Sequence, residues 1–109
     1  EYNMNVYTYE TNGGKDLIKE YLDQLPKNES AEGYFIIESL EQYGTTFLQS
    51  LNTRQLGGRL WEIKFYRHNR IFYVLINQEN IYLLHACKKQ KGKAEKFELN
   101  KARKRMLEI

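Results

Sequence analysis

Side chains suited to phosphate chemistry are concentrated between residues 64 and 93 of this 109-residue chain. Arginine can grip phosphate oxygens with two parallel hydrogen bonds, whereas lysine acts as a point charge. Arg70 and Lys89 supply one of each. Histidine changes protonation near neutral pH, so His85 is a candidate general acid or base. Together these residue types could hold an anion and move a proton beside it.

Lys64 lies in the middle of a run that alternates like a strand, from Leu60 to Tyr66. Alternation places successive side chains on opposite faces. One face carries Trp61, Ile63 and Phe65, and the other carries Glu62, Lys64 and Tyr66. The second face therefore either meets solvent or lines a basic cleft, and the pattern alone leaves both interpretations open.

Arg67, His68 and Arg70 cluster around the link between this run and the next one. Loop tips are normally polar, which is sufficient to explain Arg67 and Asn69. Arg70 differs because it opens the apolar run RIFYVL. We therefore regard Arg70 as a stronger candidate for anion binding than its neighbours in the loop.

His85 and Cys87 end a third apolar run, which begins at Asn80. A histidine inside such a run is either a hydrogen-bonded core residue or a catalyst at the strand end, and both interpretations stay open. Cys87 has no accompanying His-and-acid pattern, so a nucleophilic role is disfavoured. No paired carboxylates suggest a two-metal nuclease site. We expect no metal and no other cofactor.

Positive charge gathers at the end of the chain. Net charge is +3, yet residues 88–109 hold nine Lys or Arg and three Glu, a net charge of +6. Lys88, Lys89 and Lys91 lead into this stretch. They form either a solvated face or a strip that contacts phosphates, and such a concentration favours an anionic partner.

The elements that must position these residues follow from periodicity and turn signals. We expect strands at 5–10, 60–66, 70–77 and 80–87, and helices at 17–25, from Asn28 to Gly44, and at 94–108. Asn28 is the expected cap of the second helix, with Ile36, Leu40 and Tyr43 facing inward, while Phe47 and Leu51 tuck against the core. The last helix should place Leu99, Ala102, Met106 and Ile109 on one face. The order β-α-α-β-β-β-α predicts an α+β fold with a small antiparallel sheet, an N-terminal helical hairpin and a basic C-terminal helix.

Length and composition limit the class of protein. One domain covering residues 1–109 is expected. Hydrophobic residues make up 41% and charged residues 28%, which is ordinary for a globular protein. No apolar run is long enough to cross a membrane and no signal peptide is visible. A single cysteine fits a reducing compartment, so we expect a cytoplasmic protein without a membrane partner.

Three stretches in order, LGGRLWEIKF, RHNRIFYVL and NIYLLHACKKQKGKAEKFELNKARKRM, resemble the RelE/ParE toxin superfamily. The likeness is greatest to its HigB-type, phage-derived branch. It covers roughly residues 56–107, whereas the N-terminal hairpin matches only in layout. The features that carry it are Leu60–Ile63, Arg70, Leu83–Ala86, Lys88, Lys89, Lys91, Ala102 and the basic residues 103–105.

The resemblance implies a toxin of a type II toxin–antitoxin system, a RelE-like endoribonuclease that cleaves mRNA on the ribosome without a metal. In that reaction the substrate 2′-hydroxyl attacks the adjacent phosphate. Carried over by position, Arg70 clamps the scissile phosphate, Lys64 and Lys89 lie near it, and His85 is the acid or base. Five further residues are expected to contact RNA: Arg67, His68, Lys88, Lys91 and Lys93. Phe97 stands where the family often has a proton-transferring aromatic, so Tyr66 and Tyr73 are alternatives.

The resemblance also implies partners: the ribosome, mRNA and a cognate antitoxin, in this branch a helix-turn-helix, HigA-like protein. A toxin–antitoxin heterotetramer is one assembly of this kind. Two other functions remain open. A ParE-like toxin would poison DNA gyrase without cutting RNA, and a plain nucleic-acid-binding module would bind in a salt-dependent way without arresting growth.

Overall fold

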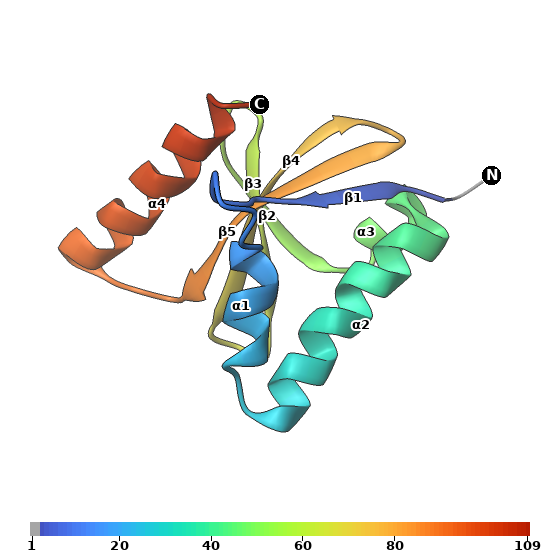
Figure 1. Ribbon diagram of the computed structural model, residues 1–109, viewed down its shortest axis with the longest axis horizontal. Coiled ribbons are helices and arrows are strands. Elements are labelled where there is room, and N and C mark those ends of the chain that lie inside the picture. The colour runs from blue at the N-terminus through green and yellow to red at the C-terminus, as the bar shows by residue number, and fades with distance from the viewer. Residues whose placement is uncertain (1–2) are drawn as a thin grey trace.

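The computed structural model describes residues 3–109, which form a five-stranded sheet with helices on both faces (Figure 1). The α+β class is confirmed. Helices α1 to α3 pack on one face and α4 packs on the other. In chain order the elements are β1 (Asn5–Thr8), α1 (Leu17–Asp23), α2 (Lys27–Tyr43), α3 (Thr45–Leu48), β2 (Asn52–Gly57), β3 (Leu60–Phe65), β4 (Asn69–Asn77), β5 (Asn80–Lys88) and α4 (Gly92–Met106).

The sheet is mixed, so the prediction of an antiparallel sheet was wrong for one strand. Its order is β1-β5-β4-β3-β2, and β1 runs parallel to β5 while the other neighbours are antiparallel. The links β3–β4 and β4–β5 are too short for a parallel crossover, which is why those hairpins were predicted correctly. Strand β1 pairs with residues far along the chain, such as Asn5 with Asn80, and no local link sets its direction.

Two elements were missed, the short helix α3 and the strand β2. Strand β2 lies at the edge of the sheet and its sequence NTRQLG is mostly exposed. An edge strand needs no apolar stripe, so the alternation that reveals a buried strand is absent. The prediction that Phe47 and Leu51 pack against the core is confirmed.

The helical hairpin builds the larger core. Asp16 caps α1 by accepting hydrogen bonds from the backbone N–H groups of Ile18 and Lys19. The two helices cross closely at Gly33, where an added Cβ would lie 2.4 Å from a methyl carbon of Leu22. Within the described residues this apolar cluster also includes Ile36, Leu40, Ile63, Ile71 and Leu83.

Several details of the predicted helices were wrong. Pro26, not Asn28, occupies the cap position of α2, because proline suits the start of a helix. Tyr43 is 49% exposed, so it does not belong to the inner stripe, whereas Ile36 and Leu40 do. Helix α4 spans Gly92–Met106, which leaves Ile109 beyond its end and exposed.

A β-bulge in the pairing of β4 with β5 decides which face His85 occupies. The register shifts so that Leu83 pairs with Tyr73 but His85 pairs with Phe72. A strand without this extra residue would place His85 on the same face as Leu83. Instead, His85 stacks on Phe72, with ring centroids 5.8 Å apart, and faces α4. The bulge therefore brings His85 to the face that also carries Arg70.

None of the helices in residues 3–109 has the length and apolar character needed to cross a membrane.

Candidate functional site

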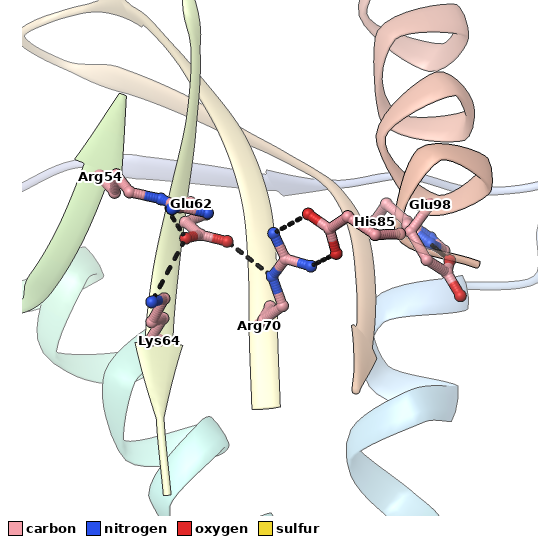
Figure 2. A network of polar contacts seen from close by, with 7 residues as sticks. Arg54, Glu62, Lys64, Arg70, His85 and Glu98 are labelled. Atoms are coloured by element: carbon pink, nitrogen blue, oxygen red, sulfur yellow. Dashed lines mark hydrogen bonds and ion pairs between the residues drawn. The ribbon is translucent and has the colours of Figure 1, made fainter. Parts of the chain in front are cut away.

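Arg70 is the centre of the polar network beneath α4 (Figure 2). It is only 1% exposed. Its Nε donates to Oε1 of Glu62 at 2.6 Å, and its Nη1 and Nη2 donate to the two carboxylate oxygens of Glu95 at 2.5 and 3.0 Å. Burial opposes the guanidinium charge, but the hydrogen bonds to Glu95 and Glu62 outweigh it and raise the pKa of Arg70. The guanidinium that was predicted to bind the scissile phosphate is therefore already bound to two carboxylates in this structure.

Further cations surround Glu62, which is fully buried on β3. The Nε of Arg54 lies 2.9 Å from Oε2 of Glu62, and the Nζ of Lys64 lies 3.9 Å from the same atom. Neither contact has hydrogen-bond geometry, so Oε2 is held by charge alone. Lys64 also lies directly across from Arg70 in the sheet.

Lys64 and Lys89 approach each other at the edge of this network. Burial, together with the nearby ammonium of Lys89, lowers the pKa of Lys64 below its ordinary value. With these two lysines included, the network holds four cations and two carboxylates. The cations are Arg54, Lys64, Arg70 and Lys89, and the carboxylates are Glu62 and Glu95. The arrangement has surplus positive charge, and an anion placed between the two lysines would relieve their repulsion.

His85 is held in one tautomer by its two neighbours from α4. Nη1 of Arg105 lies 3.2 Å from Nδ1 of His85. Arginine can only donate, so Nδ1 must accept and the ring proton resides on Nε2, which donates to Oε1 of Glu98 at 2.5 Å. Burial lowers the pKa of His85, the contact with Glu98 opposes this shift, and Arg105 adds to it. His85 is therefore a neutral imidazole with both nitrogens engaged.

Lys88 and His68 belong to a different cluster, on the side of α1 and α2. The buried amide of Asn69 accepts from Nζ of Lys88 at 3.0 Å and from the Tyr21 hydroxyl at 2.6 Å, and it donates to Glu29 at 2.8 Å. Nε2 of His68 lies 3.6 Å from the same Glu29 carboxylate. Lys88 and Lys89 are adjacent in sequence but point to opposite faces.

The remaining predicted contacts are exposed. Arg67 sits in the turn between β3 and β4, where both Tyr66 and Arg67 have left-handed backbone angles, with φ of 52° and 66°. Lys91 precedes α4 and Lys93 lies in its first turn. All three side chains are exposed to solvent.

The two tyrosines that were alternative proton donors occupy different surroundings. Tyr73 is buried in the core beneath α1 and α2, where burial raises its pKa to about 12, so it cannot reach Arg70. Tyr66 is exposed at the turn, and Phe97 is exposed on α4. Burial also raises the pKa of Cys87 to about 12, which agrees with the disfavoured nucleophilic role.

Sequence reasoning missed the acidic half of this site. Glu62 was noticed only as a strand residue, and Glu95, Glu98 and Arg105 were counted only as charge. One signal was present: Glu95 and Glu98 are three residues apart on a helix, hence on one face, within an otherwise basic stretch. Their partners lie on strands β4 and β5.

Among residues 3–109, one group of side chains has metal-binding atoms within 4.8 Å of one another: His85, Cys87 and Glu98. Zinc accepts all three ligand types. A metal on Nε2 of His85 would require the ring proton on Nδ1, but Arg105 donates to that atom. The high pKa of Cys87 also opposes the thiolate that a metal needs. The residues therefore fit a metal poorly, and metal-free chemistry remains a prediction.

Comparison with known proteins agrees with the phage-derived part of the resemblance. Residues 20–107 match the family described as "Phage derived protein Gp49-like (DUF891)". No curated protein matches the chain. The matched range includes every predicted site residue and all of the strands except β1. The chain therefore belongs to the Gp49-like family of phage-derived proteins.

Proposed function

We propose that this protein is a toxin of a type II toxin–antitoxin module and a metal-independent, ribosome-dependent endoribonuclease. The observation that carries the proposal is the gathering of Arg54, Lys64, Arg70 and Lys89 on one sheet face, with more positive than negative charge. Membership of a phage-derived, toxin-like family supports it. A cognate antitoxin, the ribosome and mRNA are the proposed partners.

The proposed reaction is an internal transesterification of RNA. The 2′-hydroxyl oxygen bonds to the adjacent phosphorus, the bond from phosphorus to the 5′-oxygen breaks, and a 2′,3′-cyclic phosphate and a 5′-hydroxyl result. One proton leaves the 2′-hydroxyl and another reaches the 5′-oxygen. Arg70 and Lys89 would stabilise the charge that grows on the phosphate oxygens.

Lys64 is the best-placed residue for proton transfer. A lysine whose pKa is lowered by burial and by a neighbouring cation gives up its proton more readily than an ordinary lysine. His85 is less suited in the observed arrangement, because its Nδ1 accepts from Arg105 and its Nε2 donates to Glu98. We assign His85 a role only after Glu98 has moved away.

The proposal is tested by inducing the protein in bacteria and mapping the 5′ ends of ribosome-bound mRNA by primer extension. New ends inside translated codons are expected within minutes of induction. Lys89→Ala should reduce cleavage by at least about tenfold, since one phosphate contact carries on the order of 1.4 kcal/mol. Lys88→Ala is the matched control, because Lys88 points to the opposite face and pairs with Asn69. Growth arrest with intact mRNA would reject the nuclease.

One observation favours a second candidate, a ParE-like toxin that binds DNA gyrase without cutting RNA. The guanidinium of Arg70 is bound by Glu62 at Nε and by Glu95 at Nη1 and Nη2. These two ion pairs give Arg70 a structural role that requires no RNA substrate. This candidate predicts a DNA-damage response after induction, whereas the nuclease predicts cleaved message first.

A further inference from the structure

Helix α4 is attached to the sheet in two different ways along its length. Within its described residues only Ala102 is fully buried, and the partly buried Leu99 and Met106 pack with it against a small cluster of Leu60, Phe72, Val74 and Leu84. All of these contacts involve the C-terminal half of the helix. Residues 92–97, by contrast, bury no apolar side chain, and Phe97 is 58% exposed.

The N-terminal half of α4 is held instead by two carboxylates. Glu95 bonds to the outer edge of Arg70, and Glu98 bonds to Nε2 of His85. Because the two glutamates are three residues apart on one helical face, a single movement of this segment would release both. The residues that they cover are Arg70, the proposed phosphate clamp, and His85, the acid or base that the family resemblance implies.

Glu95 occupies the place that a phosphate would take on Arg70. Its two oxygens accept one hydrogen bond each from Nη1 and Nη2, which is the paired geometry that a phosphate also adopts. Glu62 differs, because it is wholly buried within the sheet, whereas the Glu95 side chain is 26% exposed. Of the two partners of Arg70, only Glu95 can leave for water at modest cost.

We propose that residues 92–98 form a removable cap, and that an RNA phosphate displaces Glu95 from Arg70. The same movement carries Glu98 away from His85 and frees its Nε2. The inference rests on the proposed function, because it takes RNA as the ligand. The C-terminal half of α4 stays docked through Leu99, Ala102 and Met106.

The surrounding charges favour this exchange. Lys64 lies across from Arg70 in the sheet, with its Nζ 3.9 Å from Oε2 of Glu62, and Lys89 lies close enough to Lys64 and to Glu95 to lower the pKa of both. Lys91, Lys93 and Lys96 lie on or next to the cap and are exposed, so the same strand of RNA that binds Arg70 can also hold the displaced segment. An RNA backbone supplies several phosphates, whereas Glu95 supplies one carboxylate.

The test measures binding of a 12-nucleotide single-stranded RNA with 2′-O-methyl riboses, which cannot be cleaved. Glu95→Asp keeps the charge but shortens the side chain, so that it no longer spans to Arg70. Glu95→Gln removes the charge. Both should bind the RNA about fivefold or more tightly than the unaltered protein, as expected when a competing ion pair of roughly 1 kcal/mol is lost. Glu38→Gln, on the exposed face of α2, controls for net charge.

Hydrogen exchange gives an independent readout. With RNA bound, the amides of residues 95–98 should exchange faster while those of residues 102–106 stay protected. A purely structural Glu95 predicts the opposite pattern: Glu95→Asp would destabilise α4 as a whole and weaken RNA binding. If Glu95→Asp and Glu95→Gln bind RNA no more tightly than Glu38→Gln, the cap is rejected. Tighter binding without any cleavage of mRNA would keep the cap and reject the nuclease.

Discussion

The two faces of the sheet are covered by helices in different ways. Helices α1 and α2 bury a continuous apolar cluster in which Ile18, Leu22, Ile36 and Leu40 are almost inaccessible to water. Helix α4 buries one alanine fully, packs the partly buried Leu99 and Met106 beside it, and is also held by ion pairs and by hydrogen bonds from Arg103 and Arg105 to backbone carbonyls. The first face accounts for most of the apolar burial, and the second concentrates the charged side chains.

The difference has a physical consequence for function. Apolar burial stabilises a fold without regard to ions, whereas ion pairs at a partly exposed surface are weak and can be exchanged for other ions. A site that must receive a polyanion is therefore better placed under α4 than under the hairpin. Arg70 is the exception on that face, because its partner Glu62 is wholly buried.

Removing Arg70 is expected to have the largest effect. Arg70→Ala would leave Glu62 buried without its hydrogen-bonding partner, and such a loss typically costs about 3–5 kcal/mol. Denaturant unfolding should show this loss directly. Adding Glu62→Met to Arg70→Met should restore much of the stability, because both charges are then gone. An Arg70→Ala protein as stable as the unaltered one would show that Arg54 alone satisfies Glu62.

A test of the two faces themselves compares one leucine from each. Leu40→Ala removes a fully buried side chain from the core beneath α2 and should lower the free energy of unfolding by about 3 kcal/mol. Leu99→Ala removes a partly buried side chain beneath α4 and should lower it by about 1 kcal/mol. Equal losses in urea unfolding would mean that apolar contacts hold α4 as strongly as they hold α2.

The sequence predicted elements that have a local cause. Short links dictated the hairpins, and helical spacing identified Ile36 and Leu40 as inward-facing residues. The parallel pairing of β1, the edge strand β2 and the bulge beside Phe72 have no such local signal. They depend on which distant segments meet in the fold.

The candidate site shows the same division. Arg70, Lys64 and Lys89 were brought to one face as expected, but their carboxylate partners come from another strand and from α4. Lys88 shows where the sequence-based prediction failed. The basic stretch at residues 88–91 was treated as one strip that contacts phosphates, but alternation at the end of the strand directs Lys88 and Lys89 to opposite faces.

The smallest expected effect concerns the pH dependence of stability and rests on the buried His85. Burial lowers the pKa of His85 in the folded protein, so below about pH 6.5, the ordinary histidine value, the unfolded chain binds a proton that the folded one does not. Stability should therefore fall as the pH drops from about 6.5 towards the lowered folded pKa, and this slope should end below it.

His85→Gln should flatten the profile of unfolding free energy against pH in this window. A slope that survives His85→Gln in this window would belong to another group, and the neutral, doubly engaged imidazole inferred from the contacts with Arg105 and Glu98 would be wrong.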